Sequence, residues 1–260
     1  MKRPASFIFY RGPSVIDGSP IVGVAIIPRK SRGNAKTGAA LVQTYILRDD
    51  AHPVDSVRSG ADFAICGACP HRGDGNGKRR TCYVQLQNGP SAVWKGLQSG
   101  RYVDRTADHG RGQCVGMLVR LGAYGDPAAI PSAVWSTMLD GAADWTGYTH
   151  QWKAGGALEA NALRLRPYVM ASADSCTDRD EAKPAGWRVF RVSTGAEDAA
   201  RLPGEAVCPA SAESGAKLTC AQCMACNGTA TGRRGDITIR IHGGTAVKAA
   251  VPALRARLVS

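Results

Sequence analysis

The sequence predicts an α/β fold: a (β/α)8 TIM-like barrel of seven or eight units, preceded by a small antiparallel β-unit. From about residue 60 onward, short apolar runs alternate with segments of helical periodicity, which is typical of a parallel sheet covered by helices. The first fifty residues instead carry β-branched runs separated by Gly, Pro, Asp and Asn, as in antiparallel strands joined by turns. We therefore expect the β-unit in residues 1–55 and the barrel in residues 56–260.

The individual elements follow from local patterns in chain order. Short apolar or β-branched runs predict strands at residues 6–10, 21–27, 40–47, 61–65, 115–121, 145–150, 168–171, 187–192, 206–207 and 237–241. Helical spacing predicts helices at residues 91–97, 131–141, 157–165, 196–201 and 246–258. Pro131 fits a first helical turn, Gly141 ends that helix, and Thr245 caps the last one. An open doubly wound sheet is the alternative, although the chain has neither GxGxxG after its first strand nor a P-loop.

Seven of the nine cysteines fall into two groups at opposite ends of the chain. The first group is Cys66, Cys69 and Cys82, and the second is Cys208, Cys220, Cys223 and Cys226. Two-residue spacing lets neighbouring thiolates reach one metal ion or one cluster. No secretory signal is visible and nine is an odd number, so we expect a cytoplasmic protein with reduced, metal-binding thiols. Cys114 and Cys176 are isolated, as core or loop thiols are.

The second group admits two kinds of metal. Its Cys-x-x-Cys-x-x-Cys spacing matches bacterial ferredoxins, and Cys208, which precedes Pro209, is a candidate for the remote fourth thiolate of a [4Fe–4S] cluster. A tetrahedral Zn²⁺ bound by these sulfurs, with His242 as a further candidate ligand, is the alternative.

Polar side chains follow the predicted strands at their carboxyl ends, where barrel enzymes build their active sites. Asp126, His150 and Asp174 are the candidate catalytic residues, and Ser172 precedes Asp174 at the same strand end. Each has a simpler explanation: a turn for Asp126, a buried strand for His150 and a helix cap for Asp174. The sequence assigns no role to His52, His71 and His109, which lie in polar loops.

The charge balance favours a polyanionic partner. The chain carries 33 Lys and Arg against 21 Asp and Glu, a formal net charge of +12, which suits a nucleic acid or nucleotide. The denser basic spots are residues 29–32, 78–80 and 233–234. A basic, solvated surface without a partner is the simpler reading. No stretch approaches the ~18 consecutive apolar residues of a membrane span, so no membrane partner is expected.

Over most of its length after residue 60, the chain resembles a group of uncharacterised phage and prophage proteins. The resemblance rests on Cys66-x-x-Cys69-Pro followed by Cys82-Tyr83, on Gly147-Tyr-Thr-His150, on Met170-Ala-Ser172 and on the terminal Cys220-x-x-Cys223-x-x-Cys226-Asn227-Gly228. It implies a mobile-element protein, in the cytoplasm of the host cell if phage-encoded, and no particular activity.

Two enzyme families share parts of this layout. The chain is similar to radical S-adenosylmethionine enzymes, in which three cysteines and a Gly-Gly-Glu-Pro-like turn hold a [4Fe–4S] cluster and the cofactor. That likeness implies Cys66, Cys69 and Cys82 as cluster ligands, and Gly125, Asp126 and Ser172 as binding residues for S-adenosylmethionine. The spacing departs from the family pattern, because two and then twelve residues separate the cysteines.

The C-terminal end instead looks like queuine-type transglycosylases, whose zinc is held by three close cysteines and a later histidine. This likeness implies Cys220, Cys223, Cys226 and His242 as zinc ligands and Asp126 or Asp174 as nucleophile. Both families predict a metal-dependent enzyme acting on a nucleic-acid base or nucleotide. The third reading is a zinc-stapled nucleic-acid-binding protein without catalysis, although aromatic residues are only 6% of the chain and avoid the basic spots.

Overall fold

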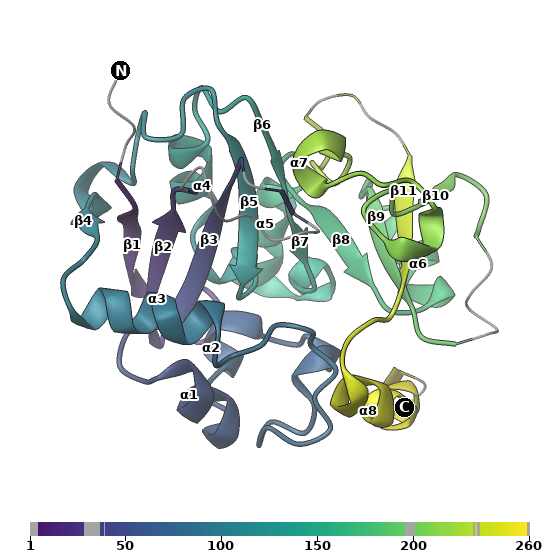
Figure 1. Ribbon diagram of the computed structural model, residues 1–260. Helices are drawn as coiled ribbons and strands as arrows, with labels where there is room; N and C mark the ends of the chain where they lie inside the picture. The colour runs from purple at the N-terminus through teal and green to yellow at the C-terminus, as the bar shows by residue number, and fades with distance from the viewer. Residues whose placement is uncertain are drawn as a thin grey trace.

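The computed structural model describes residues 5–28, 37–38, 40–195, 201–230, 232 and 235–258, which form a mixed α/β fold with parallel sheets (Figure 1). The strands are β1 (Phe7–Pro13), β2 (Pro20–Ile26), β3 (Leu41–Arg48), β4 (Val103–Asp104), β5 (Leu118–Tyr124), β6 (Asp144–Thr146), β7 (Tyr148–Thr149), β8 (Met170–Ala173), β9 (Val189–Ser193), β10 (Glu205–Val207) and β11 (Asp236–Arg240). The α-helices of the described residues are α1 (Pro53–Ser59), α2 (Phe63–Cys66), α3 (Gly89–Gln98), α4 (Ser132–Met138), α5 (Gly156–Leu165), α6 (Cys176–Ala182), α7 (Cys220–Cys223) and α8 (Thr245–Leu258).

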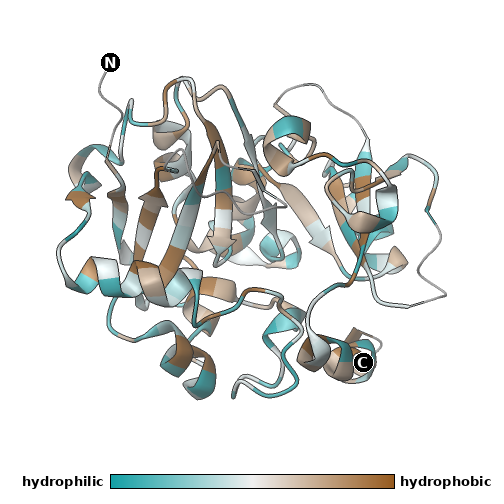
Figure 2. Cartoon of the chain, in the orientation of Figure 1, coloured by the Kyte–Doolittle hydropathy of each residue, from teal (hydrophilic) through white to brown (hydrophobic). Residues whose placement is uncertain are grey.

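The first sheet joins the N-terminal strands to the later ones in the order β4-β1-β2-β3-β5-β6. Strands β1, β2 and β3 pair antiparallel, whereas β3 pairs with β5, and β5 with β6, in parallel. Residue 55, where the β-unit was expected to end, lies inside α1 between β3 and β5. Apolar side chains dominate β1, β2 and β3, which Figure 2 shows as brown stretches between white and teal ones.

The second sheet is wholly parallel, in the order β10-β11-β9-β8-β7. Only Gly147 separates β6 from β7, so the chain passes directly from one sheet to the other at this residue. A Cβ at Gly147 would lie 2.9 Å from side-chain atoms of both Leu121 and Val169, which explains a glycine at the junction. In Figure 1, β5 and β8 consequently point to the same edge of the molecule.

The parallel strands and their helices confirm the α/β class. The pairings of the described strands form two sheets, one ending at β4 and β6 and the other at β7 and β10. The closure of these strands into a (β/α)8 barrel therefore stays a prediction. The predicted helix at residues 196–201 falls almost wholly outside the described residues, as do the basic spots at 29–32 and 233–234.

The strand predicted at residues 61–65 was wrong, because this run belongs to helix α2. Gly60 ends α1 with φ +80°, and the backbone N–H of Cys66 then donates to the Asp62 carbonyl as in a helical turn. Ala64 and Ile65 are buried by this turn. An apolar run of four residues has no period that distinguishes a strand from a helix, so tertiary packing decided the outcome.

One hydrophobic core includes side chains of the first sheet, of several helices and of β8 and β9 in the second sheet. Phe7, Trp135 and Trp187 are fully or almost fully buried in it. A second, smaller cluster beside β9 and β11 includes Cys208, Cys226 and Phe190. Among the described residues, no helix is both long and apolar enough to cross a bilayer.

A buried ion pair joins β9 to β10. The guanidinium of Arg191 donates two 2.7 Å hydrogen bonds to the carboxylate of Glu205, and both side chains are almost wholly inaccessible to solvent. Burial alone would raise the pKa of Glu205, but the bonds from Arg191 and from the Leu202 backbone outweigh it and lower that pKa. Such a lowered pKa means that the pair contributes its stability above the ordinary carboxyl pKa and loses it as the pH falls below that value.

We expect Glu205→Gln to lower the free energy of unfolding by about 3 kcal/mol at neutral pH, because it leaves the Arg191 charge buried without a matching anion. Urea denaturation measures this loss. The control is Asp55→Asn at an exposed pair with Arg58, whose effect should stay below about 1 kcal/mol. Equal effects of the two substitutions would contradict the importance given to the buried pair.

Candidate functional site

A cavity of about 400 Å³ lies against one face of the parallel strands. Its wall is built from alternate residues of each strand, which share a face because successive side chains point to opposite sides. From β5 these residues are Arg120, Gly122 and Tyr124, and from β9 they are Phe190 and Val192. The others are Thr146 of β6, Tyr148 of β7, His150 just after β7, Ile239 of β11 and Ile241 just after β11. The volume suits a small-molecule ligand.

Both cysteine groups reach this one cavity. Cys66, Cys69 and Cys82 line it from the segment around α2, whereas Cys208 and Cys220 line it from the C-terminal part of the chain. His242, Gly125, Asp126, His150 and Ser172 also line it. Asp174, Cys223 and Cys226 lie beside it rather than in its wall. The fold therefore brings most of the predicted site residues together, although their chemical roles stay predictions.

Cys66 and Cys69 of the first cysteine group sit on one tight turn. Cys66 ends α2, and Cys69 precedes the short 3₁₀ helix Pro70–Arg72. Gly67 between them has φ +53°, and a Cβ there would lie 2.4 Å from the side-chain oxygen of Gln151, so only glycine fits. Burial raises the pKa of Cys66 well above its ordinary value of 9.0, and the nearby Cys69 adds to that rise. Without a bound cation the Cys66 thiol therefore keeps its proton.

A buried glutamine fixes this turn against the strand ends. The side-chain amide of Gln151 donates to the Cys66 carbonyl at 3.0 Å and to an Asp126 carboxylate oxygen at 3.2 Å, and its oxygen accepts from the Ala68 N–H. Asp126 also accepts from the backbone N–H of His150 at 2.8 Å and of Ala128 at 2.9 Å. Both carboxylate oxygens of Asp126 are thus engaged in holding loops, which matches its simpler explanation as a turn residue.

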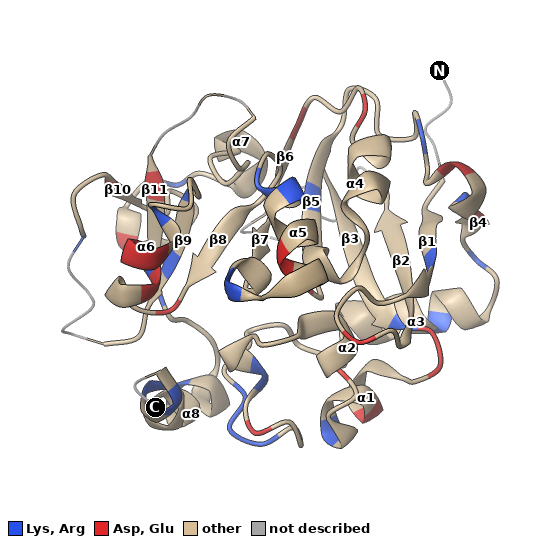
Figure 3. Cartoon of the chain, turned by 180° about the vertical axis from the view of Figure 1, so that it is seen from behind, with Lys and Arg blue, Asp and Glu red and all other residues tan. Residues whose placement is uncertain are grey.

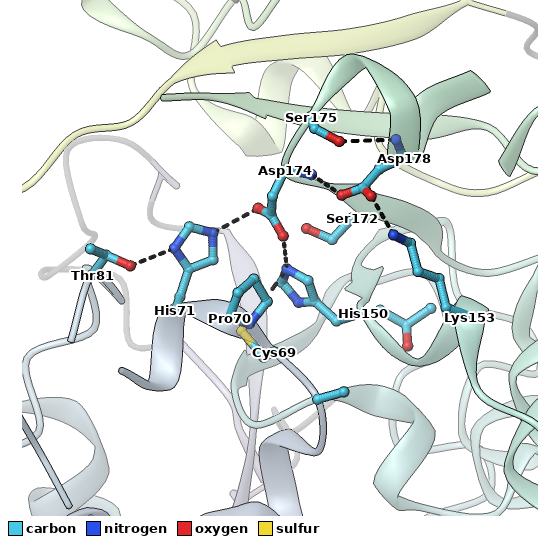
Figure 4. A network of polar contacts seen from close by, with 12 residues as sticks. Cys69, Pro70, His71, Thr81, His150, Lys153, Ser172, Asp174, Ser175 and Asp178 are labelled. Atoms are coloured by element: carbon cyan, nitrogen blue, oxygen red, sulfur yellow. Dashed lines mark hydrogen bonds and ion pairs between the residues drawn. The ribbon is translucent and has the colours of Figure 1, made fainter. Parts of the chain in front are cut away.

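Two imidazoles converge on one buried carboxylate, as Figure 4 shows. Nε2 of His71 lies 2.8 Å from Oδ1 of Asp174, and Nε2 of His150 lies 3.1 Å from Oδ2. Burial alone would raise the pKa of Asp174, but the two histidines outweigh it and hold that pKa well below its usual range. Burial opposes a charge on His150, yet Cys69 and Asp174 raise the pKa of His150 well above its ordinary value.

The position of Asp174 is set by the start of α6. Ser175 caps this helix by accepting from the Asp178 N–H, and Asp178 in turn accepts from the Asp174 N–H at 2.8 Å. Lys153 pairs with Asp178 on the outer side (Figure 4). The predicted helix cap therefore lies one residue later, at Ser175, which leaves the Asp174 carboxylate to face the histidines.

The second cysteine group includes Cys226, which lies at the start of β7. Burial raises the pKa of Cys226 to about 12, although a hydrogen bond from Tyr148 lowers it and the charges of Cys208, Cys220 and Cys223 raise it further. The four thiols are thus close enough to influence one another. The Cys226 carbonyl accepts from the Gly147 N–H at 3.0 Å, which anchors the group to the junction of the two sheets.

Tyr83 connects the two halves of the cavity. Its ring stacks on that of His242 with centroids 5.3 Å apart, and its hydroxyl bonds to Arg120 of β5. The Arg120 guanidinium forms no ion pair with a carboxylate of the described residues. His242 therefore lies against the residue that follows Cys82 of the first cysteine group.

Sequence reasoning missed His71, Tyr83 and Arg120 as members of the site. His71 follows Cys69 by two residues, so the pattern Cys-x-x-Cys-x-His was the available signal. Arg120 sits inside an apolar strand and shows no local pattern that would mark it. No family model, curated protein or solved structure matches this chain in comparisons with known proteins.

We expect Gln151→Ala to lower the free energy of unfolding by about 2 kcal/mol, because it leaves without a hydrogen-bond partner the buried polar groups that this amide now satisfies. It should also weaken any metal bound by Cys66 and Cys69, whose turn it releases. Denaturation and metal analysis measure the two effects, with Gln98→Ala at the exposed end of α3 as control. Unchanged stability would show that the turn holds its shape without the glutamine.

Proposed function

We propose that this protein is a metal-dependent enzyme of a mobile element that acts on a nucleic-acid base or nucleotide in the host cytoplasm. In this proposal Cys66, Cys69 and Cys82 hold a [4Fe–4S] cluster in the manner of radical S-adenosylmethionine enzymes. The observation that carries the proposal is that all three thiols line one cavity that lies against a face of the parallel strands. The proposal does not depend on barrel closure.

An open metal site is favoured over a structural one. A structural zinc is enclosed by four protein ligands, whereas a catalytic centre keeps a coordination position for its substrate or cofactor. Here three thiols face a cavity of ligand size, and the charges of Cys69 and Cys82 add to the effect of burial in raising the pKa of Cys66. Cys66, Cys69 and Cys82 would hold the proposed cluster with one iron open to the cavity, and with an external one-electron reductant it would supply the reductive cleavage of S-adenosylmethionine.

The spacing of the thiols supports a cluster over a single ion. Sulfurs around one zinc at about 2.3 Å lie about 3.8 Å apart. In the described residues, the one set of three or more potential ligand atoms that lie within 4.8 Å of one another contains no cysteine. No three cysteine sulfurs of the described residues meet that limit, and a multi-iron group, whose thiolates bind different iron atoms, does not require them to.

The remaining cavity residues supply recognition. Arg120 offers to a phosphate or carboxylate a guanidinium that pairs with no carboxylate of the described residues, and the stacked rings of Tyr83 and His242 offer a flat surface to a base. Gly125 and Ser172 also line the cavity, as a role in cofactor binding requires. Figure 3 shows basic segments in α8 and in the neighbouring loop, where Arg257 donates to the Arg79 carbonyl. This end of the molecule suits a polyanion.

The contacts of Asp126 and Asp174 weaken the transglycosylase alternative. That chemistry needs an aspartate whose oxygen is available to attack an anomeric carbon. Asp126 already accepts three hydrogen bonds, and Asp174 is buried behind two histidines. The binding-protein alternative would instead show closed four-ligand sites and no cofactor turnover.

We expect protein purified without oxygen to contain iron and sulfide and to absorb broadly in the visible range, as thiolate-bound clusters do. Cys66→Ala, Cys69→Ala and Cys82→Ala should each lose one cluster and the cleavage of S-adenosylmethionine. The matched control is Cys114→Ala, which removes a core thiol away from the cavity and should keep both. Colourless protein with one zinc per chain would contradict this proposal.

We further expect the C-terminal cysteines to hold a separate metal, with Cys208 as the fourth ligand. Cys226→Ala or Cys208→Ala should remove that metal and leave the first cluster's spectrum in place, because the two groups come from separate segments of the chain. Loss of all metal in the Cys226 variant would indicate one shared centre.

A further inference from the structure

We propose that His71, His150 and Asp174 form a second metal site, which binds a divalent transition metal such as Fe²⁺, Mn²⁺ or Zn²⁺ through two imidazoles and one carboxylate. This site is distinct from both cysteine groups and does not rest on the proposed reaction. The three ligand atoms lie within 4.8 Å of one another and are the one such set in the described residues. Two histidines with one carboxylate are an established ligand set for non-haem iron and for catalytic zinc.

The distances suit one ion. Ligand nitrogens and oxygens bound at about 2.1 Å to the same metal lie about 3 Å from one another. The two imidazole nitrogens lie 2.8 and 3.1 Å from the carboxylate oxygens that they face. The rings meet edge to face, with centroids 5.7 Å apart and planes at 69°, so their Nε2 atoms can point at one position without a ring clash.

The surroundings orient the ligands as metal-binding histidines require. Nδ1 of His71 lies 2.8 Å from the Thr81 hydroxyl, and donation of the Nδ1 proton to this oxygen leaves the Nε2 lone pair for a metal. Asp174 is fixed in turn by its backbone bond to Asp178 and by the cap of α6. The three ligands come from three separated segments of the chain, and Figure 4 shows that these segments meet at one point.

The site is open on one side only. His71 and His150 line the cavity, whereas the carboxylate of Asp174 lies behind them with 3% of its side chain exposed. A metal held here would therefore keep its free coordination positions toward the cavity. A substrate in the cavity would meet this metal on the same side as Arg120 and the first cysteine group.

Cys69 is a neighbour of this site rather than a member. Its sulfur lies 3.9 Å from the same Nε2 of His150 that faces Asp174, and it does not belong to the set of atoms within 4.8 Å. The shared nitrogen also excludes a Cys–His–Asp triad in this geometry, because a triad uses opposite ring nitrogens for its two partners. The competing explanation is a hydrogen-bonded network in which both imidazoles donate Nε2 protons to Asp174.

Cobalt(II) is the probe that separates these explanations. It is added to the protein as purified, so that the cysteine groups keep the metals they carry. We expect one equivalent of Co²⁺ to bind with visible d–d bands and without a thiolate-to-cobalt charge-transfer band. His71→Ala and Asp174→Asn should weaken binding at least tenfold. Thr81→Val, which keeps the shape of the side chain and removes only the orienting hydroxyl, should weaken it about tenfold.

The matched control is His109→Asn, which removes an imidazole far from the site and suits the left-handed backbone there (φ +53°). It should bind Co²⁺ as the wild type does, and circular dichroism checks that each variant is folded. Absence of Co²⁺ binding in the wild type would overturn the proposal in favour of the hydrogen-bonded network. A thiolate charge-transfer band lost in Cys69→Ala would overturn it in favour of a cysteine site.

These outcomes are independent of the iron–sulfur proposal. If the cysteines hold no cluster, the nitrogen and oxygen signature of cobalt at His71 and Asp174 should persist. If that signature is absent while iron and sulfide are present, only the second metal site fails.

Discussion

The side chain of Gln151 and the carboxylate of Asp126 hold together the region on which the site depends. They join three segments that are far apart in sequence: the Cys66 turn, the end of β5 and the start of the loop after β7. Every one of these bonds uses a buried polar group, which would cost free energy if left unpaired. The turn that carries Cys66 and Cys69 is thereby fixed at the strand edge, and His150 is fixed beside it by its own backbone N–H.

Charge in the cavity is arranged around groups that are costly to bury. Burial disfavours the thiolate forms of Cys66, Cys82 and Cys226, whereas the carboxylate of Asp174 stays charged between two imidazoles. Arg120 keeps its charge near Tyr83, Tyr148 and Cys220. Bound cations at the thiols and a bound anion at Arg120 would each offset a desolvation cost that the protein alone leaves in place. Buried ionisable groups with shifted pKa values, such as these thiols and Arg120, are typical of functional sites.

The order of the strands explains how two ends of the chain share one cavity. β11 inserts between β9 and β10, so that Cys208 and His242 follow neighbouring strands although more than thirty residues separate them. His242 in turn stacks on Tyr83, the residue that follows Cys82 of the first cysteine group. Only one residue, Gly147, separates β6 from β7, so the chain continues in the same direction through both strands. Tyr148 and His150 therefore line the same cavity as Arg120 of β5.

Local patterns by themselves determined the α/β class, most strand and helix positions, and the location of Asp126, His150 and Asp174 just after strands. These features are local because hydrophobic periodicity and two-residue cysteine spacing act over a few neighbouring residues. Only the tertiary structure decided that residues 63–66 are helical, that Asp126 holds loops, and that His71 meets Asp174 across 103 positions. The physical reason is that such contacts form when separate strand ends converge at one edge, and no short-range pattern records which ends will meet.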